Sequence, residues 1–227
     1  MQSRECRAEY LQPSAFVDSD APNVRVFTQR ALAGVADATP TEKAIRLFDA
    51  VRDQLRYDPF NIPTVADAYR ASHVALQPTA YCVPKAILLT AAYRAAGIPA
   101  AVGFADVRNH LNSPKLAELM DTDLFIYHGY VSLWLDGHMI KVTPAFNSEL
   151  CERFGVKPLV FDGRNDALFH EFDMRNKRHM EYVNDRGWFA DPPMDKLLDE
   201  FRTTYPKLWT SARARAAVSD KAFGTAR

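Results

Sequence analysis

The sequence predicts an α+β domain in which helices come first and an antiparallel β-sheet follows. Capping and periodicity signals mark strong helices over residues 40–56 and 82–96. Asp136-Gly137 then joins two β-rich runs, residues 124–135 and 138–143, which is a strong signal for a type I′ hairpin. Helices followed by hairpin-connected strands are typical of the α+β class.

The chain length suits one domain with short extensions. Its 227 residues divide into an N-terminal lead-in over 1–38, a single domain over 39–210 and a flexible tail over 211–227. Apolar residues make up 48% of the chain, which is enough to bury a core. Lys plus Arg and Asp plus Glu number 28 each, so no basic excess predicts a nucleic-acid partner.

Targeting and redox signals point to a cytoplasmic protein. No run approaches the ~18 apolar residues of a membrane span, and the charged start lacks the apolar stretch of a secretory signal. The three cysteines are Cys6, Cys82 and Cys151, without Cys-x-x-Cys spacing. An odd, sparse set predicts free thiols in a reducing compartment. We therefore expect neither a membrane nor a nucleic acid as a partner.

The helix over 40–56 has a complete N-terminal signal. Thr39 is a natural N-cap, Pro40 suits the first helical position, and Glu42 completes a capping box. Ile45 and Phe48 begin an apolar stripe at helical spacing.

Cys82 lies where a loop becomes the second strong helix. Pro84 is tolerated only in a first turn, so it fixes the helix start near Cys82, and Gly97 ends the helix. A thiol at a helix N-terminus meets unpaired N–H groups and the positive end of the dipole, which lower its pKa. The position predicts a nucleophile, although a buried cysteine is more often a small inert hydrophobe.

The strands bring a histidine into the same region. Residues 98–107 read as a strand, and Ser113 caps a short helix that reaches about Met120. With Asp136-Gly137 at the turn, Leu135 faces His138. The same register makes Thr143 and Asn147 the diagonal, same-face neighbours of His128.

The order of these segments resembles the transglutaminase-like branch of the papain-like thiol enzymes. The segments that carry the resemblance are Cys82-Val83-Pro84-Lys85-Ala86, Tyr93-Arg94-Ala95-Ala96-Gly97-Ile98-Pro99-Ala100 and His128-Gly129-Tyr130-Val131-Ser132-Leu133-Trp134-Leu135-Asp136-Gly137. Together they cover roughly residues 40–147. The fold that the resemblance implies is a cysteine-bearing helix packed against an antiparallel sheet that carries the histidine.

The resemblance also implies a reaction. Cys82 would attack a carbonyl to form a thioester, and His128 would take and return the proton. The N–H of Cys82 and a donor from the preceding loop, for which Gln77 is a candidate, would bind the oxyanion. Hydrolysis of an amide or another acyl bond in a peptide or small molecule is the expected outcome, without a cofactor.

One position departs from the family pattern. The family usually carries an aspartate about 15 residues after the histidine, and here that position is Thr143. Asn147 or Asp162 could orient the imidazole instead, or the enzyme could work as a dyad. A non-catalytic or weakly active binding module on the same fold is the alternative.

Other polar and aromatic residues have weaker signals. Tyr81, Tyr127 and Tyr130 either line a pocket or belong to the core. Asp106 begins a polar cluster that reads as a solvated turn after a strand. A second cluster fits no zinc pattern and predicts no metal site; its members are His170, Asp173, His179 and Glu181.

Overall fold

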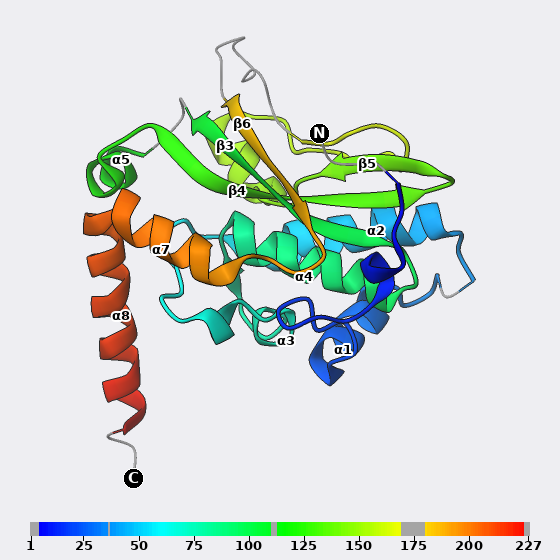
Figure 1. Cartoon of the computed structure of the whole chain (residues 1–227), viewed down its shortest axis with the longest axis horizontal. Helices are drawn as coiled ribbons and strands as arrows, with labels where there is room; N and C mark the ends of the chain where they lie inside the picture. Colours follow the sequence, from blue (N-terminus) through cyan, green and yellow to red (C-terminus); the bar gives the residue numbers. More distant parts are fainter. Residues whose placement is uncertain (1–4, 36, 110–112, 169–179, 225–227) are drawn as a thin grey trace.

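A four-stranded antiparallel sheet covers one side of a buried helix. The computed structural model describes residues 5–35, 37–109, 113–168 and 180–224. The strand order is β5-β4-β3-β6, with β3 at Ala100–Asn109, β4 at Leu124–Leu135, β5 at His138–Val142 and β6 at Met180–Phe189. Figure 1 shows this sheet lying over α4, with the helices of the N-terminal part on the other side of α4.

Helix α4 (Cys82–Ala95) is the centre of the molecule. It contacts β4 and β3 on one side, and on the others α1 (Pro22–Ala31), α2 (Pro40–Gln54) and α3 (Ala71–Val74). Nearly every residue of α4 is buried, which explains why its sequence is apolar all round rather than on one stripe. The predicted α+β fold, with the cysteine helix packed on an antiparallel sheet, is confirmed.

Helix α2 carries the predicted capping box, and its other end is tied to α4. The side chains of Thr39 and Glu42 each bond the backbone N–H of the other residue. At the far end the buried Nζ of Lys85 donates to the carbonyl oxygens of Arg52, at 2.8 Å, and Leu55, at 2.7 Å, and burial lowers the pKa of this amino group to about 7. A cation at a helix C-terminus satisfies carbonyls that have no helical partner. Lys85 therefore fixes the first turn of α4 against α2.

The β4–β5 hairpin has the predicted turn and register. Asp136 and Gly137 both have positive φ, at 49° and 79°, as a type I′ turn requires. Leu135 pairs with His138, and the pairing continues to Val131 and Val142.

Parts of the expected lead-in and of the expected tail pack on the core. Val17 and Val24 of the lead-in are fully buried in the main core. The expected flexible tail begins inside α8 (Pro206–Gly224). Leu208 and Ala212 of α8 are buried, which anchors its first turns.

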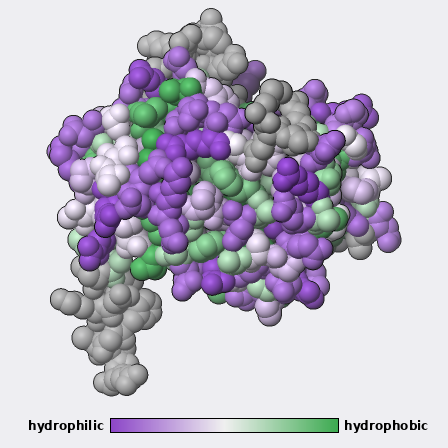
Figure 2. All heavy atoms as spheres, in the orientation of Figure 1, coloured by the Kyte–Doolittle hydropathy of each residue, from purple (hydrophilic) through white to green (hydrophobic). Residues whose placement is uncertain are grey.

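The remaining elements are short, apart from α7. They are η1 (Ala8–Leu11), β1 (Arg56–Tyr57), η2 (Ala66–Tyr69), β2 (Thr79–Ala80), α5 (Pro114–Met120), α6 (Ser148–Phe154) and α7 (Met194–Thr204). Strand β6 and the short parallel pair β1–β2 were not predicted. None of the helices in the described ranges is both long enough and apolar enough to cross a bilayer. The face in Figure 2 is mostly hydrophilic, with apolar atoms in separate patches.

Candidate active site

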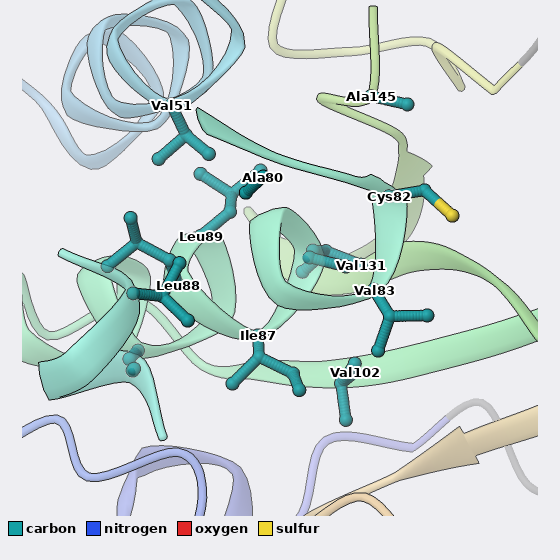
Figure 3. Packing of buried hydrophobic residues seen from close by; sticks show 14 of the residues in the cluster. Val51, Ala80, Cys82, Val83, Ile87, Leu88, Leu89, Val102, Val131 and Ala145 are labelled. Carbon is teal, nitrogen blue, oxygen red and sulfur yellow. The ribbon is translucent and has the colours of Figure 1, made fainter. Parts of the chain in front are cut away.

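Cys82 is the first residue of α4. Tyr81 is the N-cap in extended conformation, and Pro84 lies in the first turn, as the sequence predicted. The Cys82 side chain is 7% exposed. Figure 3 shows it leaving the start of the helix on the side away from Leu88 and Leu89.

Gly129 of β4 packs directly on this first turn. A Cβ atom on Gly129 would lie 2.8 Å from the Cys82 carbonyl oxygen and 3.0 Å from Val83 Cα. Only glycine permits so close an approach of strand and helix. His128, the residue before Gly129, is thereby held beside the thiol. The backbone N–H groups of Gly129, Val83 and Cys82 each lower the pKa of the Cys82 thiol.

Cys82 and His128 line one small cavity of about 30 Å³. A buried water needs about 10–15 Å³ by this measure, so the space suits a reacting carbonyl group or a water and little more. None of the described residues that line it is a carboxylate. They are Tyr57, Pro59, Ile62, Tyr81, Cys82, Leu116, Met120, Phe125, Ile126, His128, Phe201, Tyr205 and Leu208.

A β-bulge lies immediately before His128. The β3–β4 register shifts between Ala105 and Val107, and Tyr127 has a positive φ of 53°. Bulges re-aim the side chains next to them and often flank active sites. The Tyr205 hydroxyl accepts the N–H of Ile126, at 2.7 Å, and donates to the carbonyl oxygen of Leu124, at 2.8 Å.

A partly buried ionic network holds the bulge. The Asp106 carboxylate accepts the Tyr127 N–H at 3.1 Å and pairs with Arg186 of β6 at 2.6 Å. Arg186 also pairs with Glu200 of α7, and its guanidinium lies 4.0 Å from the centroid of the Tyr127 ring. The Tyr127 hydroxyl donates to Glu200. Asp106 is therefore an internal ion-pair partner and not part of a solvated turn.

The predicted low pKa of the Cys82 thiol is wrong. Burial raises it to about 11, although the N–H groups around the sulfur and the Lys85 ammonium each lower it. Burial likewise lowers the pKa of His128, which is 1% exposed, to about 4. At neutral pH the pair is a thiol and a neutral imidazole, since desolvation outweighs the helix N-terminus.

Thr143 contacts His128, and neither of the two candidates for the third residue, Asn147 and Asp162, has a contact with it among the bonds described below. The Thr143 hydroxyl oxygen lies 3.5 Å from Nε2 of His128 and donates to the Gly129 carbonyl at 2.9 Å. Asn147 is the N-cap of α6, and its Oδ1 accepts the Tyr57 N–H at 3.0 Å. Asp162 is exposed, and both its oxygens accept hydrogen bonds within its own loop, which lowers its pKa to about 2.

The predicted pocket residues separate. Tyr81 lines the cavity, and its hydroxyl bonds that of Tyr69 at 2.7 Å. Gln77 lies outside the cavity wall, where its amide nitrogen contacts His73 at 3.2 Å. Tyr127 and Tyr130 are also absent from the cavity wall; the Tyr130 hydroxyl donates to Asp185 of β6.

Sequence reasoning missed the part of the wall that comes from the C-terminal helices. Phe201, Tyr205 and Leu208 recur at helical spacing, and this signal predicts one buried face. It does not say what that face covers. The sequence predicts no metal site at the cluster of residues 170, 173, 179 and 181. The first three of these lie outside the residues that the structure describes. Among the described residues, no group of three or more His, Cys, Asp or Glu side chains could hold a metal ion.

Comparison with known proteins places the chain in a family. A solved structure of a proposed cysteine protease from Cytophaga hutchinsonii is similar, at 15% identity and a TM-score of 0.45. The similarity covers 78% of this chain and 53% of that protein, so the chain spans about half of its length. No curated protein matches. The family model of the transglutaminase-like superfamily matches residues 27–144, slightly more than half of the chain. The chain therefore belongs to the transglutaminase-like superfamily.

Proposed function

We propose that this protein is a cysteine-dependent acyl-transfer enzyme that hydrolyses an amide or another acyl bond through a Cys82 thioester. One observation carries the proposal: Cys82, at the start of α4, and His128, on β4, line the same small cavity. Membership of the transglutaminase-like superfamily supports a cysteine-dependent enzyme, without specifying its reaction.

The proposed cycle begins from the neutral pair. As the sulfur attacks the carbonyl carbon, the thiol proton moves to the imidazole of His128. The N–H groups of Cys82 and Val83 have no helical acceptor at the start of α4, so they stabilise the oxyanion. The tetrahedral intermediate expels the leaving amine or alcohol, which takes the proton from the imidazolium.

Water completes the cycle. His128 removes a proton from the water as its oxygen attacks the thioester, and the released sulfur recovers that proton. The product is a carboxylic acid, and Cys82 returns to the thiol. A burial-lowered His128 pKa of about 4 keeps the imidazole unprotonated at neutral pH, as a general base must be. We also propose the reducing, cytoplasmic setting in which such a thiol persists.

Thr143 favours a second candidate, a non-catalytic binding module. A hydroxyl 3.5 Å from Nε2 of His128 supplies no negative charge to stabilise an imidazolium. Such a module would bind acyl compounds without turning them over.

Turnover of a panel of amides and esters separates the two candidates. We expect Cys82→Ser to lose turnover by more than about 1,000-fold and His128→Gln by about 100-fold or more. Cys6→Ser is the matched control, because Cys6 is an exposed thiol outside the site, and its turnover should equal that of the unaltered protein. Equal turnover in Cys82→Ser would exclude this nucleophile, and no turnover of any compound would favour the binding module.

A further inference from the structure

A larger cavity adjoins the one that contains the Cys82 thiol. It has a volume of about 280 Å³, against about 30 Å³ for the cavity at Cys82 and His128. It lies among the loop after β1, the start of α5, the start of β4 and helix α6.

The two cavities share a wall. Tyr57, Pro59, Leu116 and Phe125 line both. The two cavities are therefore neighbours that meet at these four side chains.

The larger cavity is lined mainly by apolar side chains. Besides the shared residues it is walled by Phe60, Phe146, Leu150, Phe154 and Val156. The ring of Phe146 packs edge-on against Tyr57, with centroids 4.7 Å apart.

Four residues of the cavity wall are polar or charged: Asp58, Ser113, Cys151 and Arg153. The Asp58 carboxylate accepts the Phe60 N–H at 2.9 Å, and the Ser113 hydroxyl accepts the Leu116 N–H at 3.2 Å. Cys151 is buried, whereas Arg153 is exposed. Apolar walls gain free energy when they cover apolar surface, so a mainly apolar lining favours an apolar occupant.

We propose that the larger cavity binds the aliphatic chain of an acyl substrate whose carbonyl reaches Cys82. The inference rests on the proposed function, because it deepens the substrate class of the same site. The thiol cavity holds only the reacting group, so the rest of the acyl group must lie elsewhere. The adjoining cavity has room for several methylene groups. The preferred substrate is therefore a medium-chain acyl ester, thioester or amide.

Chain length is the direct kinetic test. With p-nitrophenyl esters from acetate to octanoate, kcat/KM should rise about fourfold for each CH₂ that becomes buried, and on the order of 4,000-fold across the series if all six added CH₂ groups are buried. Leu150→Trp fills the cavity from α6 and should lower the octanoate-to-acetate ratio at least tenfold. Glu152→Trp is the matched control, because Glu152 lies on the same helix but is exposed and outside the cavity wall; its ratio should not change. A flat series, or an unchanged ratio in Leu150→Trp, overturns the proposal.

Binding of octanoate tests the cavity without any turnover. Calorimetric titration should show octanoate binding to the unaltered protein at least tenfold more tightly than to Leu150→Trp. Phe154→Ser, at an exposed position on the cavity rim, provides a second variant that should fold even if Leu150→Trp does not. Weaker octanoate binding in these variants supports the assignment of the cavity. If octanoate binds in this way but no ester is hydrolysed, the proposed function fails and the cavity assignment stands. No octanoate binding, or equal binding in the variants, overturns the inference.

Discussion

The hydroxyl of Thr143 donates a 2.9 Å hydrogen bond to the carbonyl oxygen of Gly129 and lies 3.5 Å from Nε2 of His128. A hydroxyl has one hydrogen, and here that hydrogen is directed to the carbonyl. Toward Nε2 the Thr143 oxygen can therefore act only as an acceptor. This arrangement favours the tautomer of His128 that carries its hydrogen on Nε2.

Thr143→Asp should raise the pKa of His128. A carboxylate in place of the hydroxyl stabilises the imidazolium, so the pKa moves upward from about 4. The acid limb of the kcat/KM profile reports the free enzyme's base and should shift to higher pH by at least about one unit. Thr143→Asn, which adds no charge, is the control. An acid limb at the same pH in both variants would show that this position does not influence the imidazole.

His128 should make the folded state less stable in acid. Its folded pKa of about 4 lies below the ordinary value of 6.5, so between these values the unfolded state binds the proton more tightly. The contribution of His128 to the free energy of unfolding does not change with pH above about pH 6.5. As the pH falls toward 4, the free energy of unfolding decreases by about 3 kcal/mol in total. Urea unfolding of His128→Gln should lack this loss, whereas His138→Gln, at an exposed position, should keep it. Parallel pH dependences in the His128→Gln variant and the unaltered protein would contradict the assignment.

Cys82 should react slowly with iodoacetamide at neutral pH. Burial both raises the pKa of its thiol to about 11 and restricts access to the sulfur. Peptide mapping at pH 7 should find label on the exposed Cys6 first. The rate at Cys82 should then rise about tenfold for each pH unit up to about pH 10. Selective labelling of Cys82 at pH 6 would instead indicate a thiolate that is already formed in the resting protein.

Arg186→Met should destabilise the fold. It leaves the carboxylate of Asp106 buried without its cation, and breaking a buried ion pair on one side costs about 3–5 kcal/mol. Arg202→Met is a matched control, because Arg202 makes an exposed i,i+3 pair with Asp199, of the kind worth less than about 1 kcal/mol. Urea unfolding compares the two free energies. Equal losses would show that the network contributes no more than a surface pair.

The elements with local signals could be predicted from the sequence. Pro84 and Gly97 bracket α4, and Asp136-Gly137 sets a hairpin register that places Thr143 near His128, as the structure has it. These signals lie within a few residues of the feature that they define, so no knowledge of the rest of the chain is needed.

The missing parts depend on contacts between distant segments. Strand β6 is a polar edge strand with Tyr182 and Val183 exposed, so it lacks the apolar alternation that marks a half-buried strand. Asp106 reads as a turn residue until Arg186, 80 positions later, neutralises it. The prediction of a low thiol pKa is wrong for a related reason. The burial of Cys82, which raises its pKa, depends on Phe201 and Tyr205 as well as on its own helix.

The most direct test of the central claim is to trap the acyl-enzyme. The protein is mixed with p-nitrophenyl acetate, quenched in acid within milliseconds to seconds, and mapped by peptide mass spectrometry. The account predicts one acetyl group on the peptide that contains Cys82, formed at least about 100-fold more slowly in His128→Gln. Acetylation that is absent from Cys82, or that proceeds at the same rate in His128→Gln, would contradict it.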